Sequence, residues 1–455
     1  MANTGEAPKQ SKPSSLKRVI GRRMLLFFII GDILGAGIYV LVGRVAGHVG
    51  GMLWLPFLLA FVLAVLTAAA YSELAGKYSQ AAGAALYVNK AFKIPFVTFI
   101  VAFAVMMSGV TSAGVSAQAF GGRYLAEFVT LPVIVGALIF LGLVTLVNFV
   151  GISESVKVNV TLTVIEGSGL LVIVVIGIYA LLTGEGDPGR ALEFNPRSGA
   201  FLSVLQGTAL AFYALLGFED SVNLAEEAKD PARDFPYALF GGIVVAAVIY
   251  MAVAFTAAML VDTQTLTNSS GPLLEVVKVA GLSFPPKMFA LIALFAVANT
   301  ALMNMIMASR LVYGMACQRV VPSMFANVHP ARGTPWVAIL FTTAIAAVLV
   351  ATGDIGGLAE TTVLLLLCVF ALVNVSVLVL RRDRVDHEHF RAPTWMPVLG
   401  ALVCLILALP ITGRDTAVYV RVSVLIAIGV VLWFINRLCV GKVQELDATQ
   451  IMSGE

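Results

Sequence analysis

Long apolar runs dominate this chain, and short polar segments separate them. A helix needs about 20 apolar residues to cross the hydrocarbon core of a bilayer. A spanning β-strand would alternate apolar and polar positions, which these runs do not, so the pattern predicts an all-α integral membrane fold. We expect twelve transmembrane helices, near residues 24–47, 52–73, 94–116, 129–151, 157–183, 201–226, 237–261, 286–316, 335–352, 358–380, 396–412 and 416–436.

The composition agrees with the lipid bilayer as solvent. Of the 455 residues, 59% are hydrophobic and 12% are charged, which is about half the charged fraction of soluble domains. A net charge of +3 is too small to indicate a nucleic-acid partner. The four cysteines form no CxxC motif and lie in or beside apolar runs, so we interpret them as small hydrophobic residues and expect no metal site.

Lysine and arginine set the expected orientation, because they concentrate in cytosolic loops. If the N-terminus is inside, the inner segments hold 20 of the 29 Lys and Arg residues and the outer segments hold eight, with Lys157 in neither set. We therefore expect a multi-pass protein of the cell membrane with cytosolic tails at 1–23 and 437–455. Residues 1–23 are polar and basic and precede a full-length apolar run, so we expect no signal peptide.

Two of the predicted spans contain sequences that interrupt a helix. The first reads GDILGAGIY at 31–39, and the sixth reads FYALLGFEDSV at 212–222. If the first ten spans form two repeats of five, these segments occupy matching positions, and such a pair indicates a transporter binding site. A broken helix exposes N–H groups that attract an anion and C=O groups that attract a cation, and an amino acid carries both charges. The alternative is that these glycines only allow close helix packing.

Several motifs resemble the amino acid–polyamine–organocation superfamily of transporters. They are LGAGIYVLVG (34–43), YSELAGKYSQAAGAALYV (71–88), GFEDSVNLAEEAKDPARDFPYAL (217–239) and the segment 309–340, and the resemblance covers roughly residues 20–440. It implies a LeuT-type fold, in which residues 24–183 and 201–380 form a 5+5 inverted repeat with broken helices 1 and 6, and residues 396–436 add two C-terminal helices. The implied function is secondary active transport of amino acids.

The resemblance also implies a substrate site made mostly of backbone. The α-carboxylate is expected at the N–H groups, and the α-ammonium at the C=O groups, of these residues respectively: Gly35, Ala36 and Gly37; Ile33, Tyr213 and Leu216. Tyr213 matches an aromatic gate, although an ordinary packed aromatic explains it equally well. Candidate wall residues, each of which packing alone also explains, are Met107, Ser108, Thr111, Asn299 and Asn304.

Lys157 matches the position at which sodium-independent relatives place an ammonium group in the sodium site. Burial lowers the affinity of a lysine for its proton, so Lys157 is a candidate proton-coupling residue. A lysine that snorkels to the surface, or that stays charged and replaces sodium, are the alternatives. Asp32 and Glu219 flank the two breaks and are expected to act as gates or polar clasps, whereas Glu166 is open to a simple interhelical hydrogen bond.

Two polar loops receive no chemistry. We expect AEEAKDPARDFP (225–236) to be solvated, with Pro231 and Pro236 stopping helices. RRDRVDHEHF (381–390) contains two histidines, but a solvated loop is the favoured interpretation over a metal site.

Other function classes find less support. The chain has no GxSxG, HExxH or Walker motif, so we expect no enzyme and no cofactor. The alternatives that remain are a sodium-independent exchanger of amino acids or organic amines such as polyamines, a channel, and a transporter-like sensor. The sequence leaves the choice among neutral amino acids, cationic amino acids and polyamines open.

Overall fold

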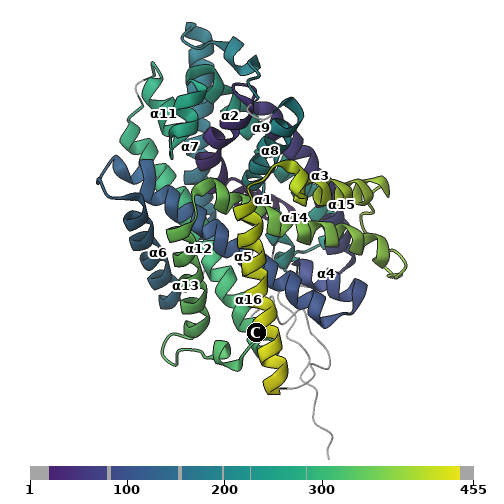
Figure 1. Ribbon diagram of the computed structural model, residues 1–455. Coiled ribbons are helices and arrows are strands. Elements are labelled where there is room, and N and C mark those ends of the chain that lie inside the picture. Colours follow the sequence, from purple (N-terminus) through teal and green to yellow (C-terminus); the bar gives the residue numbers. More distant parts are fainter. Residues whose placement is uncertain are drawn as a thin grey trace, which may run out of the picture.

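A computed structural model describes residues 20–78, 83–151, 156–196, 199–225, 227–282 and 284–440. Within α7 and α16, the side chains of residues 156–160 and 439–440 lie outside the description. Every regular element of the described residues is a helix, and Figure 1 shows these helices packed in one bundle. Helix α11 lies at one end of the bundle and α16 ends at the opposite end.

The described chain forms sixteen α-helices: α1 Arg22–Ile33, α2 Ala36–Val49, α3 Trp54–Lys77, α4 Gly83–Phe92, α5 Pro95–Ala119, α6 Val133–Val150, α7 Val156–Thr183, α8 Ala200–Ala214, α9 Pro231–Leu260, α10 Thr263–Asn268, α11 Pro272–Val279, α12 Pro286–Cys317, α13 Trp336–Thr352, α14 Ile355–Leu380, α15 Trp395–Ala408 and α16 Thr416–Val440. Five short π or 3₁₀ turns join them: η1 Phe120–Tyr124, η2 Pro188–Leu192, η3 Asp220–Leu224, η4 Ser323–Ala326 and η5 Pro410–Thr412. Four helices begin with proline, whose missing N–H costs nothing in a first turn.

The apolar runs predicted from the sequence coincide with these helices. Eight of them, α3, α5, α6, α7, α9, α12, α14 and α16, are long and apolar enough to cross a membrane. The bent pair α1–α2 makes a ninth, and α8, α13 and α15 are shorter apolar helices. Helices α15 and α16 are separate, as predicted. An all-helical protein with several membrane-spanning helices is therefore confirmed, while the count of twelve spans stays a prediction.

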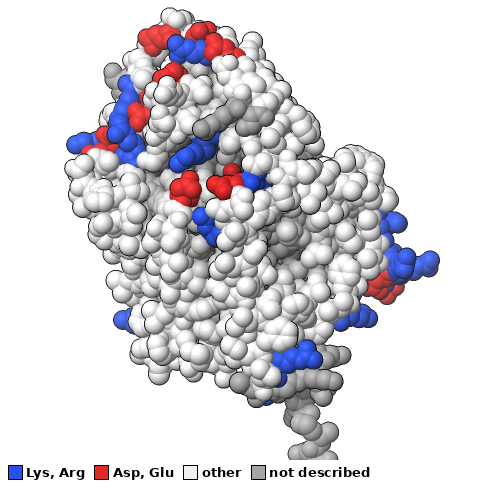
Figure 2. Space-filling model, viewed as in Figure 1, with Lys and Arg blue, Asp and Glu red and all other residues white. Residues whose placement is uncertain are grey.

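The surface of the bundle is suited to lipid. Large apolar side chains are exposed on the peripheral helices α6 and α7, for example Leu143, Leu146, Leu171 and Val175. Figure 2 shows a broad uncharged surface, with charged side chains gathered at the upper end and along the lower and right margins. Helices α5 and α14, in contrast, are mostly buried inside the bundle. The polar interior that these helices surround is therefore separated from lipid by an apolar layer.

The segment 225–236 is more ordered than the sequence suggested. Helix α9 begins at Pro231 and continues through Pro236, so the expectation that Pro236 stops a helix is wrong. Pro236 lies near the start of a 30-residue helix, whose remaining hydrogen bonds and packing outweigh the one N–H that proline lacks. Asp234 is buried and accepts a hydrogen bond from Arg22 at 3.1 Å, so this loop is only partly solvated.

The segment 381–390 is likewise not a free loop, because it is tied to the end of α3. Arg381 donates two hydrogen bonds, of 2.8 and 2.7 Å, to the carboxylate of Glu73 in a nearly buried pair. Lys77 donates to the backbone carbonyl of Asp383, and the Tyr78 hydroxyl donates to the Asp383 carboxylate at 2.6 Å. Burial and this hydrogen bond raise the pKa of Tyr78, so its phenol stays a donor at neutral pH. The contacts fix α14 against α3.

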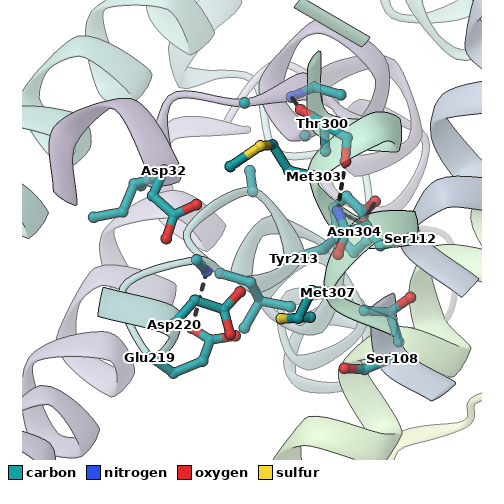
Figure 3. A pocket seen from close by; sticks show the side chains of 18 of the residues that line it. Asp32, Ser108, Ser112, Tyr213, Glu219, Asp220, Thr300, Met303, Asn304 and Met307 are labelled. Atoms are coloured by element: carbon teal, nitrogen blue, oxygen red, sulfur yellow. Dashed lines mark hydrogen bonds between the residues drawn. The ribbon is translucent and has the colours of Figure 1, made fainter. Parts of the chain in front are cut away.

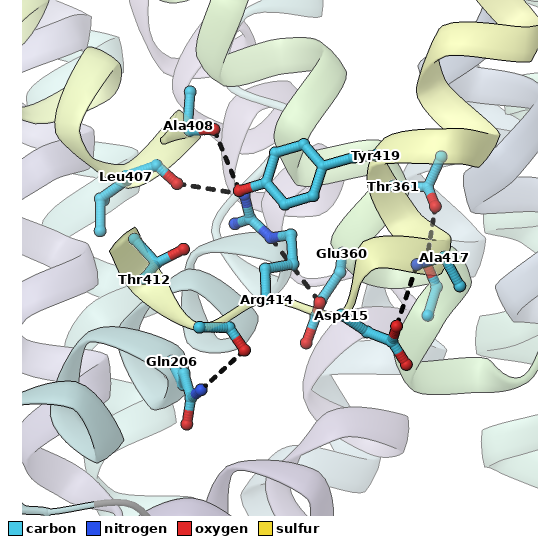
Figure 4. A network of polar contacts seen from close by, with 12 residues as sticks. Gln206, Glu360, Thr361, Leu407, Ala408, Thr412, Arg414, Asp415, Ala417 and Tyr419 are labelled. Atoms are coloured by element: carbon cyan, nitrogen blue, oxygen red, sulfur yellow. Dashed lines mark hydrogen bonds and ion pairs between the residues drawn. The ribbon is translucent and has the colours of Figure 1, made fainter. Parts of the chain in front are cut away.

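At the opposite end of α14, the turn between α15 and α16 contains a buried cation, Arg414 (Figure 4). Its side chain is 2% exposed, and its Nε lies 3.6 Å from a carboxylate oxygen of Glu360 on α14. Its Nη1 donates to the carbonyl of Leu407 at 3.1 Å. The neighbouring carbonyl of Gly413 accepts a 3.0 Å hydrogen bond from Gln206 on α8. The turn thus joins α14 and α8 to the C-terminal helices.

We expect Arg414→Leu to destabilise the protein, because it leaves the carboxylate of Glu360 buried without its cation. Removing one member of a buried ion pair costs roughly 3–5 kcal/mol, so the thermal unfolding midpoint in detergent should fall. The double variant Arg414→Leu with Glu360→Leu should recover most of the loss, and Arg384→Leu, on an exposed side chain, should change little. Equal losses in the single and double variants would show that the ion pair is not responsible.

Candidate functional site

The first helix interruption lies between α1 and α2. Helix α1 ends at Ile33, α2 begins at Ala36, and the two axes differ by 43°. The hydroxyl of Thr300 on α12 accepts a 3.0 Å hydrogen bond from the N–H of Ala36, and the hydroxyl of Tyr250 donates to the carbonyl of Ile33. Side chains from other helices therefore satisfy backbone groups that the interruption frees, as burial in a membrane requires.

The second interruption follows α8. The helix ends at Ala214, and a turn leads into η3, which begins at Asp220. Gly217 in this turn has a φ of +116°, a conformation that favours glycine. Its N–H donates to the carboxylate of Glu219 at 2.9 Å. The acid that follows the glycine thus clasps the unwound turn.

The two interruptions touch each other through glycine. A Cβ on Gly217 would lie 2.6 Å from the backbone carbonyl oxygen of Asp32, and a Cβ on Gly37 would lie 2.6 Å from the Cα of Ala214. Both distances are shorter than any ordinary carbon contact, so a larger residue at either position would force the segments apart. Close approach of the two broken helices therefore depends on these two glycines.

A cavity of about 160 Å³ lies where the interruptions meet, lined also by α5, α7, α12 and α14. In Figure 3, Asp32, Glu219 and Asp220 face it from one side, and Ser112 and Asn304 face it from the other. Its described lining residues are Phe28, Gly31, Asp32, Ile33, Gly35, Ala36, Gly37, Val105, Ser108, Ser112, Glu166, Tyr213, Ala214, Leu216, Gly217, Glu219, Asp220, Asn299, Thr300, Met303, Asn304, Met307, Thr362 and Leu366.

The cavity brings together most of the residues that the sequence singled out. Those that line it are Ile33, Gly35, Ala36, Gly37, Tyr213, Leu216, Asp32, Glu219, Ser108, Asn299 and Asn304. Two expected wall residues do not line it. Met107 is fully buried, and the hydroxyl of Thr111 lies 2.7 Å from that of Thr362 on α14. Lys157 belongs to the first turn of α7, but its side chain lies outside the described residues.

The structure adds wall residues that the sequence analysis did not select. They include Ser112, Thr300, Met303 and Met307. Helical spacing would have found them, because Ser112 lies four residues after Ser108 and Met303 and Met307 are four residues apart, and such residues share a helix face. Selecting the polar residues singly, rather than a whole helix face, left them out.

One chain of hydrogen bonds links the two broken helices across the cavity wall. The hydroxyl of Tyr213 on α8 lies 2.8 Å from that of Ser112 on α5. The amide nitrogen of Asn304 donates to the Ser112 hydroxyl at 3.4 Å and to the carbonyl of Thr300 at 2.8 Å. Thr300 in turn holds the N–H of Ala36. A displacement of α8 is therefore felt at the start of α2.

Comparison with known proteins agrees with this geometry. The model of a family described as amino acid permease matches residues 20–435. The chain belongs to this family. It is a membrane permease by family, and the matched region contains both helix interruptions and every residue of the cavity.

Relatives of this permease cover nearly its whole length at low identity. An uncharacterized transporter of Mycobacterium tuberculosis is 26% identical over 436 residues, which are 96% of this chain and 95% of the relative. The branched-chain amino acid permease of Bacillus subtilis is 25% identical over 93% of this chain and 94% of its own. The chloroplastic cationic amino acid transporter 9 of Arabidopsis thaliana is 27% identical over 71% of this chain and 59% of its own.

We expect Gly37→Val and Gly217→Ala each to lower the thermal unfolding midpoint of this permease, because the new Cβ forces the broken helices apart. At Gly217 the backbone conformation adds a strain of about 1–3 kcal/mol. Gly142→Ala is the matched control, since nothing lies within 4 Å of its added Cβ. If all three variants unfold at the same temperature, the close contact between the interruptions is not required for stability.

Proposed function

We propose that this permease is a secondary active transporter that moves amino acids across the membrane by alternating access. The observation that carries the proposal is the cavity at the junction of two interrupted membrane helices. Interrupted helices present backbone N–H and C=O groups at membrane depth, where they have value only as a binding site for charged cargo. Membership in the amino acid permease family supports the same class of cargo.

The proposed binding mode uses both ends of the interruptions. The first N–H groups of α2 have no acceptor in their own helix. Thr300 accepts from Ala36, and Gly37 supplies the next donor for a substrate carboxylate. The carbonyls of Ile33, Tyr213 and Leu216 line the same cavity and suit the substrate ammonium.

The LeuT-type arrangement belongs to the same proposal. Residues 24–183 and 201–380 would form inverted repeats, each beginning with an interrupted helix, and residues 396–436 would add the last two of twelve spans. The excess of lysine and arginine in alternate loops supports cytosolic termini, with tails at 1–23 and 437–455. Alternating access then follows as a movement of one repeat against the other around the cavity.

Coupling to protons, without sodium, is proposed through Lys157 at the start of α7. A lysine ammonium and a sodium ion about 4 Å apart would repel by roughly 4 kcal/mol at an effective dielectric constant of 20. The two cations should therefore exclude each other. Gain and loss of the lysine proton would then allow a proton gradient to bias transport.

A sodium-independent exchanger of amino acids or organic amines is the second candidate. The cavity has the features of a site for an amine whichever gradient drives it, and the named relatives include permeases for branched-chain and for cationic amino acids. A channel and a transporter-like sensor remain weaker alternatives, because interrupted helices around a central cavity suit alternating access better than an open pore.

The decisive experiment is uptake of radiolabelled amino acids into liposomes that contain only this permease. We expect an inward proton gradient to drive accumulation without sodium, because the Lys157 ammonium replaces the sodium ion. Lys157→Ala should abolish accumulation. Lys287→Ala, which removes an exposed lysine at the start of α12, should leave it unchanged.

The other outcomes separate the alternatives. A strict requirement for a sodium gradient would overturn the role of Lys157. Exchange that ignores both gradients would favour the exchanger, and uptake by neither route would remove transport as the function.

Tyr213 tests the aromatic gate. Its hydroxyl bonds with Ser112, and its ring lines the cavity. We expect Tyr213→Ala to raise the half-saturation constant for every transported amino acid about tenfold, the effect of losing about 1.4 kcal/mol, without changing the dependence on the proton gradient. Tyr213→Phe should keep most of the affinity, since the ring remains. Equal half-saturation constants for wild type and Tyr213→Ala would show that this aromatic only packs.

A further inference from the structure

The cavity is lined by four carboxylate side chains. Asp32 comes from α1, Glu166 from α7, Glu219 from the turn after α8, and Asp220 from η3. None of its described lining residues is lysine, arginine or histidine. The wall therefore has carboxylates in excess and no described cation to balance them.

Glu166 is the acid of this group with the clearest unmet need. Its side chain is buried, with 1% of the residue exposed. One carboxylate oxygen, Oε1, accepts a 3.0 Å hydrogen bond from Asn299. The other, Oε2, is fully buried and has no hydrogen-bond partner among the described residues. A buried carboxylate oxygen without a donor is unfavourable, so this atom needs a proton or a cation supplied by something that enters the cavity.

The neighbouring contacts hold Glu166 in place at the cavity wall. The hydroxyl of Tyr39 on α2 donates to the backbone carbonyl of Glu166, and Asn299 fixes one oxygen of its side chain. Asn299 precedes Thr300, which holds the N–H of Ala36 at the start of α2. Glu166 is therefore positioned beside the proposed backbone site.

Glu166 is also distinct from the proposed coupling residue. Nine residues of α7 separate it from Lys157, about 13.5 Å along the helix axis. The Glu219 carboxylate, in contrast, already accepts a hydrogen bond from the N–H of Gly217. Of the carboxylates in the cavity, Glu166 is thus a free acceptor that faces cargo and has no established role.

We propose that the cargo carries a net positive charge, as an amino acid with a basic side chain or as a diamine, and that Glu166 binds its second cationic group. The inference rests on the proposed transport function. A neutral amino acid brings one ammonium and one carboxylate, so it adds no net charge to offset the acids. A second ammonium or guanidinium supplies the donor that Glu166 Oε2 lacks, and the remaining acids stabilise the added charge.

The test is competition in liposomes that contain the full chain. Uptake of labelled arginine is measured against unlabelled arginine, lysine, putrescine and leucine. We expect arginine, lysine and putrescine to compete at concentrations at least about tenfold lower than leucine, since a hydrogen bond to a charged group is worth this factor or more. Glu166→Gln keeps an oxygen for Asn299 but loses the charge, so it should weaken arginine binding by a similar factor and leave leucine binding unchanged.

Glu193→Gln, on an exposed side chain outside the cavity, is the matched control and should behave as wild type. Preferred transport of leucine, with arginine and putrescine inert, would overturn the inference but leave amino acid transport standing. A Glu166→Gln variant that changes only the pH dependence of uptake would overturn it as well, and would make Glu166 a proton site. Uptake of none of the four probes would overturn both the inference and the proposed function.

Discussion

Everything in this structure depends on placing unwound backbone inside a membrane without leaving its polar groups unpaired. Two helices break at the same depth, and the breaks touch through Gly37 and Gly217, where no other residue fits. Water is absent at that depth, so the freed groups need partners from the protein. Thr300, Tyr250 and Glu219 supply them. The cost of two interrupted helices is thereby limited, and what remains unpaired faces a cavity.

The surroundings of the cavity explain why it persists. Helices α5 and α14 are mostly buried around it, and the exposed apolar side chains of α6 and α7 separate the polar centre from lipid. Ion pairs fasten α14 near both ends, Arg381 with Glu73 at one and Arg414 with Glu360 at the other. The hydrogen bonds from Tyr213 through Ser112 and Asn304 reach the α12 helix beside the first break. A fixed framework therefore surrounds two segments whose contact is made of small residues and single hydrogen bonds.

Charge gives this centre its character. The apolar content of the chain makes every carboxylate at membrane depth expensive, and the described wall nevertheless holds four. Glu219 compensates its cost by clasping Gly217. Glu166 does so with only one of its two oxygens. An acid that the fold keeps half-satisfied is explained best by a partner that comes and goes, which connects the electrostatics of the site to the movement of cargo.

The sequence by itself determined that this chain spans a membrane as helices, and that the first and sixth apolar runs break, because length, apolarity and glycine content are local properties. It also selected Asp32, Glu219, Ser108, Asn299 and Asn304, which the structure gathers around one cavity. Only the tertiary structure decided that Glu166 faces that cavity and that Thr111 and Met107 do not, since the side that each presents depends on how α5 and α7 rotate against their neighbours. It also decided that Pro236 continues a helix and that Arg381 and Arg414 are paired. Those outcomes rest on partners distant in sequence, which no local pattern specifies.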